Sequence, residues 1–102
     1  MAVRVQLPSR VLMFFVYILQ SEVNGRFYIG YSDFPERRLV EHNSGKVKST
    51  RPYRPWKKVY QESLSTEIAA INRERELKSK KSRNYLEWLI GQTRPDEYRD
   101  GQ

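Results

Sequence analysis

An unbroken apolar run begins the part of the chain that has a clear pattern. All of residues 12–19 are apolar, and positions 14–18 are aromatic or β-branched residues, which favour strands. Such a run is typical of a central strand that is buried on both faces. Asn24 and Gly25 then give a strong turn signal, so residues 26–31 are predicted to return as the second strand of a hairpin.

A helix is predicted directly after the hairpin. Ser32 or Asp33 can cap its start, and Pro35 suits its first turn. The helix continues through His42 and ends before Gly45, which gives it about two and a half turns.

The second half of the chain predicts one further strand and two further helices. Residues 46–58 are basic and interrupted by prolines, which predicts an exposed loop, and a short strand follows around residues 59–60. Ser65 or Thr66 can cap a second helix, and Ser82 can cap a third with an apolar face. The resulting order, β-β-α-β-α-α, defines an α/β (α+β) domain.

The pattern divides the chain into three parts. Residues 1–12 lack a pattern and are predicted to be a disordered leader, so that Met13 could be the natural start; residues 13–91 form the domain, and residues 92–102 form a polar tail. The apolar run does not predict a signal peptide, because it is short and polar residues follow it instead of a small-residue cleavage site. No segment approaches the roughly 20 apolar residues of a membrane span.

Composition limits the function classes. The chain has 102 residues, enough for one domain, and 19 Lys and Arg against 12 Asp and Glu give a net charge of +7. This charge favours a nucleic-acid partner over an anionic membrane surface. The absence of cysteine excludes a disulfide scaffold, a zinc ribbon and a thiol nucleophile. We expect a cytoplasmic protein.

Two tyrosines of the hairpin are candidates for chemistry. Tyr17 and Tyr28 lie on the same face of the sheet if neither strand has a bulge. A two-residue turn at Asn24 and Gly25 would leave them staggered along the strands, whereas a four-residue loop over residues 21–24 would set them opposite each other. Taken alone, strand tyrosines are more often core residues with satisfied hydroxyls.

The helices add charged candidates. Arg38 and His42 are four residues apart and therefore share a helix face, while Arg37 and Glu41 form a neighbouring pair. Glu74 lies beside the apolar stripe of the second helix, where an unpaired carboxylate is costly. We expect it to meet Arg73 or Arg38, or a metal ion, because Mg²⁺ is commonly held by one carboxylate with phosphate and waters.

The order and spacing of these residues resemble the GIY-YIG nuclease domain. The matching elements are Phe15-Val16-Tyr17, Tyr28-Ile29-Gly30, Arg38, His42 and Glu74, and together they span about residues 13–91. The chain looks like the small single-domain bacterial members, which are related to the N-terminal nuclease module of the excision-repair incision subunit. Phe15 and Val16 replace the Gly and Ile of the family's first motif, and both suit a buried strand.

The resemblance implies a three-stranded antiparallel sheet flanked by helices, one Mg²⁺ or Mn²⁺ ion, and hydrolysis of phosphodiesters without a covalent intermediate. It implies that Tyr17 or Tyr28 helps to deprotonate the attacking water, and we favour Tyr28. Arg38 would stabilise charge on the phosphate, His42 would assist, and Glu74 would bind the metal. Substrate-gripping residues are expected in the basic loop and on the first helix, namely Arg37, Lys48, Arg51, Tyr53, Arg54 and Trp56.

Three functions remain open at this point. The first is a metal-dependent endonuclease, with DNA more likely than RNA as substrate and a role in repair or recombination. The second is a nucleic-acid-binding module without useful activity, and the third is an accessory subunit that holds a protein partner. The complete set of five site residues favours the first. The oligomeric state is not predicted.

Overall fold

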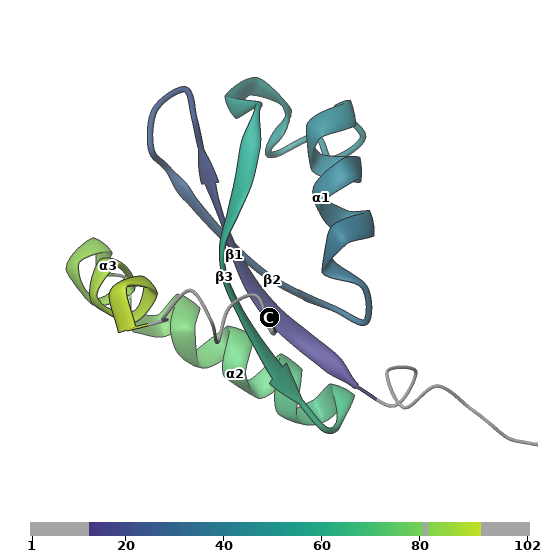
Figure 1. Ribbon diagram of the computed structural model, residues 1–102, viewed down its shortest axis with the longest axis vertical. Helices are drawn as coiled ribbons and strands as arrows, with labels where there is room; N and C mark the ends of the chain where they lie inside the picture. The colour runs from purple at the N-terminus through teal and green to yellow at the C-terminus, as the bar shows by residue number, and fades with distance from the viewer. Residues whose placement is uncertain (1–12, 81, 93–102) are drawn as a thin grey trace, which may run out of the picture.

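A three-stranded antiparallel sheet forms the centre of the computed structural model (Figure 1), which describes residues 13–80 and 82–92. The strands are β1 (Phe14–Ser21), β2 (Phe27–Ser32) and β3 (Trp56–Leu64), in the order β2-β1-β3. The predicted fold class and element order are confirmed. The predicted leader lies outside the described residues, as does the predicted tail from residue 93 onward.

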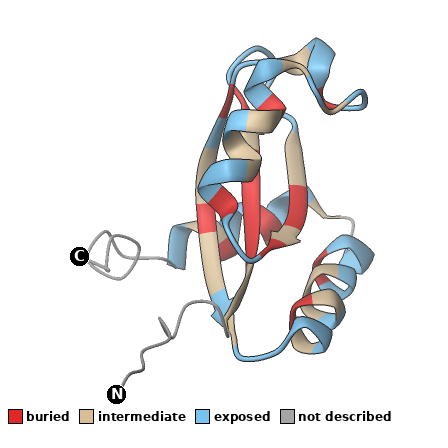
Figure 2. Ribbon diagram, turned by 90° about the vertical axis from the view of Figure 1, so that its right-hand side faces the viewer, coloured by how far each residue is buried: buried red, intermediate tan, exposed pale blue. Residues whose placement is uncertain are grey.

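The central strand β1 is buried on both faces, as its apolar run predicts. Val16, Tyr17, Ile18 and Leu19 are each at most 1% exposed. Because side chains alternate along a strand, Val16 and Ile18 belong to one core cluster and Tyr17 and Leu19 to another. The sheet therefore separates two apolar layers, and Figure 2 shows the buried residues concentrated along it.

Three α-helices cover the two faces of this sheet. Helix α1 (Pro35–Ser44) packs on the face of Tyr17, where Leu39 joins that cluster. Helices α2 (Glu67–Lys80) and α3 (Arg83–Gln92) cover the other face, and they bury apolar side chains against Ile18 and its neighbours. Figure 1 shows α1 on one side of the sheet and α2 and α3 on the other.

The observed N-cap residues match the predicted ones for two of the three α-helices. The Thr66 hydroxyl accepts a hydrogen bond from the Ala69 amide at 3.0 Å and so caps α2, and the Ser82 hydroxyl caps α3 in the same way. The prediction for α1 was wrong by one residue, since its N-cap is Phe34, which has no side-chain cap. Ser32 instead accepts a hydrogen bond from the Phe34 amide at 2.8 Å.

The third strand is longer than its sequence indicates. It begins at Trp56, not near Val59, and a short 3₁₀ helix, η2 (Arg51–Tyr53), precedes it. Asn43 at the end of α1 holds both backbone groups of Trp56, accepting from its amide at 2.6 Å and donating to its carbonyl at 3.0 Å. The predicted exposed loop is therefore a tethered segment that ends in a strand.

The hairpin takes a register between the two that were considered. Tyr17 pairs with Gly30, and Leu19 pairs with Tyr28, so the two tyrosines are diagonal neighbours on one face. Their ring centroids are 6.4 Å apart. The loop covers residues 22–25, because the Ser21 hydroxyl accepts hydrogen bonds from two loop amides and the Ser21 carbonyl accepts one from Gly25.

Gly30 gives space to the Tyr17 ring. A Cβ atom at position 30 would lie 2.7 Å from the Tyr17 hydroxyl oxygen and 2.8 Å from Cζ, much closer than real contacts allow. Because Tyr17 is 1% exposed and packs within the cluster of Leu19 and Trp56, its ring has little room to move. Gly30 is required here for close approach.

We expect Gly30→Ala to lower the free energy of unfolding by about 1–3 kcal/mol, because the new methyl group overpacks the site. Chemical denaturation measures the loss. Gly91→Ala is the matched control, since no atom lies within 4 Å of a Cβ at that helical position. The control should be neutral or slightly stabilising. Equal stability of the two variants would contradict the proposed packing.

Candidate active site

Buried Tyr17 and partly exposed Arg38 lie next to each other in the site. Tyr17 projects from β1 toward α1, which carries Arg38. Burial raises the pKa of Tyr17 to about 12, while the neighbouring Arg38 guanidinium acts in the opposite direction. Arg38 also forms an ion pair with Glu41 on its own helix. Tyr17 is therefore a neutral phenol beside a cation.

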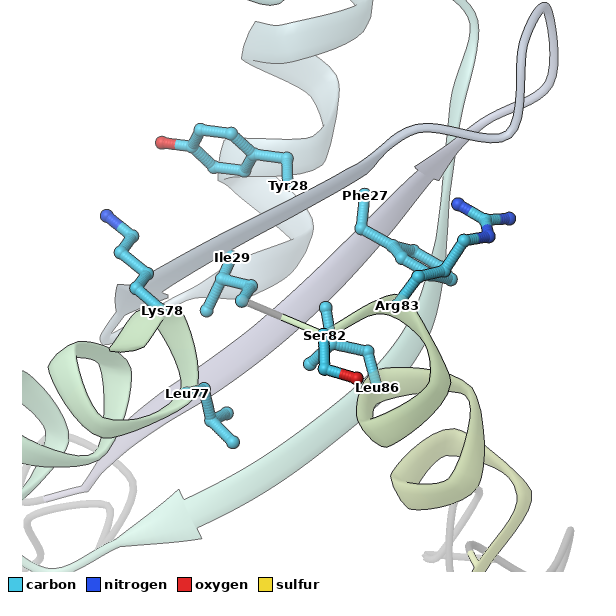
Figure 3. A pocket seen from close by; sticks show the side chains of 8 residues that line it. All are labelled: Phe27, Tyr28, Ile29, Leu77, Lys78, Ser82, Arg83 and Leu86. Carbon is cyan, nitrogen blue, oxygen red and sulfur yellow. The ribbon is translucent and has the colours of Figure 1, made fainter. Parts of the chain in front are cut away.

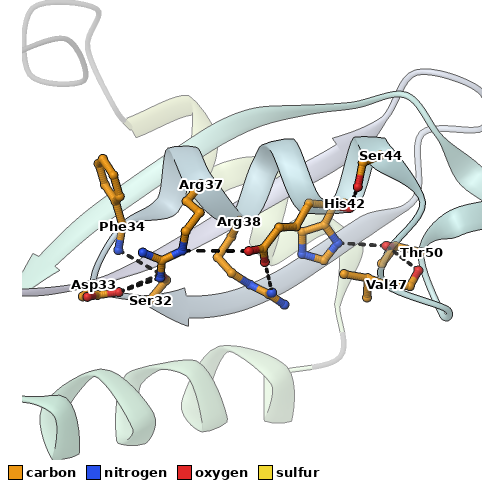
Figure 4. A network of polar contacts seen from close by, with 10 residues as sticks. Ser32, Asp33, Phe34, Arg37, Arg38, His42, Ser44, Val47 and Thr50 are labelled. Atoms are coloured by element: carbon orange, nitrogen blue, oxygen red, sulfur yellow. Dashed lines mark hydrogen bonds and ion pairs between the residues drawn. The ribbon is translucent and has the colours of Figure 1, made fainter.

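His42 lies fully buried against Tyr28, with their ring centroids 4.6 Å apart. Its Nδ1 is 2.8 Å from the Thr50 hydroxyl, and that hydroxyl donates to the Val47 carbonyl at 3.3 Å (Figure 4). Since the Thr50 proton is used in this way, Thr50 accepts from Nδ1–H. Nε2 is then a buried acceptor, and it has no hydrogen-bond partner among the described residues.

The electrostatic surroundings keep His42 neutral. Burial is the main cause and the charge of Arg38 the second, and together they lower the pKa of His42 to about 4. A neutral imidazole next to Tyr28 can accept a hydrogen bond or a proton, but it cannot serve as a permanent phosphate-binding cation.

Glu74 reaches the same region from α2. Its side chain is 18% exposed, and its carboxylate lies 2.9 Å from the ammonium group of Lys78, four residues along the helix. The prediction that it meets Arg73 or Arg38 was wrong, because Arg73 pairs with Glu62 at 3.0 Å and Arg38 pairs with Glu41. The charge of Glu74 is the smallest of the causes that raise the pKa of Tyr17, after burial and the neighbouring Tyr28.

The five predicted site residues thus come from four elements and both layers. Arg38 and His42 lie on α1, the tyrosines on β1 and β2, and Glu74 on α2. Tyr17, Tyr28, Arg38 and His42 lie together on the α1 face of the sheet, whereas Glu74 lies on α2, where it pairs with Lys78. Within residues 13–80 and 82–92, no group of three or more His, Cys, Asp and Glu side chains could hold a metal ion. A metal at Glu74 would therefore take its remaining ligands from water and substrate.

The predicted substrate-gripping residues of the basic loop differ in how far they are exposed. Lys48, Arg51 and Arg54 are exposed and cationic. Tyr53 is half-buried, and the guanidinium of Arg26 lies 4.1 Å from its ring centroid. Trp56 does not present a ring for base stacking, since it is 3% exposed.

Arg37 is exposed on α1, and its guanidinium lies 3.0 Å from the Asp33 carboxylate and 3.9 Å from the Glu41 carboxylate. The pair with Glu41 is the one that the sequence predicts. Both contacts join exposed or partly exposed side chains, so the guanidinium can exchange them for a phosphate.

Sequence reasoning missed two residues that act on the site. Thr50, the residue just before η2, sets the tautomer of His42 through its hydroxyl. No sequence signal links the two positions. Lys78 pairs with Glu74, and the spacing of four residues along one helix was a usable signal for it.

A comparison with protein families agrees with this geometry. The model of the GIY-YIG catalytic domain matches residues 13–86. The chain therefore belongs to the GIY-YIG family, a family of nucleases.

Its relatives include uncharacterised proteins of similar size. The chain is 41% identical over 66 residues to a UPF0213 protein of Staphylococcus epidermidis, which covers 64% of this chain and 79% of the relative. It is 38% identical over 76 residues to a UPF0213 protein of Streptococcus pneumoniae, which covers 74% of this chain and 76% of the relative. The solution NMR structure of a UPF0213 protein of Bacillus halodurans is similar with a TM-score of 0.53 and 33% identity, over 84% of this chain and 92% of that chain.

The state of His42 can be tested directly, because it is the chain's single histidine. We expect its ring NMR signals to remain constant from pH 8 to about pH 5 and to shift only near pH 4. The unfolded chain binds this proton near pH 6.5, so the contribution of His42 to stability is present above pH 6.5 and is lost as the pH falls toward 4. His42→Gln should remove that part of the pH dependence. A titration midpoint near 6.5 would contradict the buried neutral state.

Proposed function

We propose that this protein is a divalent-metal-dependent endonuclease that hydrolyses phosphodiester bonds in DNA. The observation that carries the proposal is the packing of Tyr17 against Tyr28 on one face of the sheet, in a chain whose residues 13–86 match the GIY-YIG catalytic domain. Arg38 on α1 adds a cation to these phenols, and Glu74 on α2 adds a carboxylate. Phosphodiester cleavage needs charge neutralisation and alignment above all, and these groups supply them.

Arg38 is the group that neutralises the phosphate. Its side chain is 32% exposed, and its ion pair with Glu41 engages one part of the guanidinium while the remaining donors stay available. Its partner Glu41 lies three residues along the same helix. Such pairs are weak, so an incoming phosphate can replace Glu41.

Tyr28 is the more suitable base for the attacking water. Tyr17 is almost fully buried and its pKa is about 12, so it remains a neutral hydrogen-bond partner. Tyr28 is half-buried and has His42 beside it, whose Nε2 is an acceptor without a partner in the described structure. We infer that Tyr28 orients the attacking water and takes its proton, and that His42, which stays neutral, accepts a hydrogen bond from the Tyr28 hydroxyl at Nε2.

Glu74 is the ligand for a single Mg²⁺ or Mn²⁺ ion. The residues fit such an ion, because the carboxylate is partly exposed and its ion-pair partner Lys78 is a cation with 54% exposure. One carboxylate with waters and substrate oxygens is a usual set for Mg²⁺. When bound, the ion would neutralise charge on the phosphate and the leaving oxygen.

The exposed cations of residues 46–54 provide a substrate-binding surface next to α1. Lys48, Arg51 and Arg54 would contact DNA phosphates, with Arg37 extending the surface along the helix. A role in DNA repair or recombination is the proposed use of this activity, and a DNA substrate agrees with the predicted cytoplasmic location. Across residues 13–80 and 82–92, the structure contains no helix long and apolar enough to cross a membrane.

Glu74→Gln and Arg38→Ala should each lower the rate of DNA cleavage by about 10²-fold or more, because each removes charge stabilisation from the transition state. Gel assays on single-stranded, branched and duplex DNA with Mg²⁺ or Mn²⁺ measure the loss. Glu76→Gln and Arg75→Ala are matched controls on the exposed side of α2 and should cleave normally. DNA binding by the two site variants should change little.

These assays also separate the proposal from its competitors. A wild-type protein that binds DNA with steep salt dependence but cleaves none of the substrates is a binding module. Weak binding to all nucleic acids, with one protein partner co-purifying in defined amount, would indicate an accessory subunit. Cleavage that survives Glu74→Gln would assign the activity to another site.

The roles of the two tyrosines can be separated by removing one hydroxyl at a time. Tyr28→Phe should lower the cleavage rate by about 10²-fold or more, because it removes the base. Tyr17→Phe should have a smaller effect on the rate, because the Tyr17 hydroxyl is almost fully buried and its raised pKa keeps it a neutral phenol. Single-turnover kinetics measure both losses. A larger kinetic loss in Tyr17→Phe would reverse the assignment.

A further inference from the structure

A cavity of about 390 Å³ lies next to the candidate active site, between β2, the end of α2 and the start of α3 (Figure 3). Its volume lies in the range of about 300–1,000 Å³ that is typical of small-molecule sites. The proposed mechanism does not use this cavity.

The lining combines an apolar interior with two cations. Phe27, Ile29, Leu77 and Leu86 supply apolar and aromatic surface, and no lining residue is acidic. Lys78 and Arg83 also line the cavity, with side chains 54% and 52% exposed. An aromatic or flat apolar group flanked by negative charge matches this lining, and a nucleobase between two phosphates has these properties.

The cavity and the candidate active site lie on opposite faces of the edge strand β2 and are linked by two residues. Tyr28 lines the cavity, while its ring packs against His42 on the α1 face. Lys78 lines the cavity and pairs with the Glu74 carboxylate at 2.9 Å. A strand whose phosphate lies between Arg38 and Glu74 would therefore have its next nucleotide at the entrance of the cavity.

The two cations can exchange their present partners for phosphate. Lys78 pairs with Glu74 on α2 and Arg83 with Glu87 on α3, each at 2.9 Å over four residues of one helix. Arg83 Nη1 also donates to the Gly25 carbonyl at 2.9 Å. Pairs of this kind contribute little stability. The Arg83 guanidinium is also held over the Phe27 ring, 4.6 Å from its centroid, so the cation and the aromatic wall form one unit.

We propose that this cavity receives an unpaired nucleobase of the DNA strand being cut, with Lys78 and Arg83 on the adjoining phosphates. The inference rests on the proposed function and narrows its substrate class to DNA with an unpaired or easily extruded nucleotide beside the cleaved bond. Taking a base out of a stack costs least where the base has no partner. Fully paired duplex should therefore be a poor substrate.

The test measures binding in the Glu74→Gln background, so that no cleavage interferes. Two DNA duplexes are compared by fluorescence anisotropy, one fully paired and one carrying a single unpaired thymidine. We expect the duplex with the unpaired base to bind about tenfold more tightly, as base stacking on an aromatic surface allows.

Two variants alter the cavity in different ways. Leu86→Phe fills it, and Phe27→Leu removes its aromatic wall while keeping apolar bulk. Either change should reduce the tenfold preference to about twofold or less. Trp88→Ala is the control, because Trp88 is an exposed residue of α3, 57% accessible, and does not line the cavity. Circular dichroism checks folding, and Phe27→Leu decides the test if Leu86→Phe does not fold.

The outcomes distinguish this inference from the proposed function. Equal binding of the two duplexes, or a preference that survives both cavity variants, overturns the cavity assignment even if wild-type protein cleaves DNA. A preference lost in the cavity variants supports the assignment even if wild-type protein cleaves nothing. With active protein, cuts that map beside the unpaired nucleotide support both, and equal binding with self-association in sedimentation would indicate a second copy as occupant.

Discussion

The passage of the Tyr17 ring across Gly30 is the contact on which the rest of the site depends. Tyr17 starts from the buried central strand, and only a residue without Cβ on β2 leaves room for its ring. The hydroxyl thus reaches the edge of the sheet, where β2 has no further neighbour. Groups from both faces can meet there, which the interior of a sheet would prevent. Arg38 arrives from α1 and Glu74 from α2.

Each apolar layer therefore holds one part of the chemistry. The cluster around Leu19 and Trp56 fixes α1 and, through it, Arg38 and His42, while the cluster around Ile18 and Leu77 fixes α2 and Glu74. The hydrogen bonds between Asn43 and the Trp56 backbone add a polar connection between α1 and β3. Mutations in either core are thus expected to move one half of the site relative to the other.

The sequence was informative wherever local pattern decides structure. The buried strand and the helix caps at Thr66 and Ser82 follow from periodicity and capping chemistry, and the contact of Tyr17 with Tyr28 on one face follows from strand alternation. The hairpin register did not, because the segment between the strands can close at several positions and the Ser21 hydroxyl selects one of them. Trp56 was misread because prolines and cations surround it, whereas its burial depends on Asn43 and Thr50, which are 13 and 6 residues away.

The charges of the site are arranged for an exchange of partners. In the protein alone, Arg38 is paired with Glu41 and Glu74 with Lys78, each within one helix and each partly exposed. Such pairs keep the charged groups in place at little energetic gain, so they oppose replacement only weakly. A phosphate at Arg38 and a cation at Glu74 would replace both pairs at once and release Lys78 toward the substrate. Because His42 and Tyr17 remain neutral, no other fixed charge of the buried site competes with this exchange.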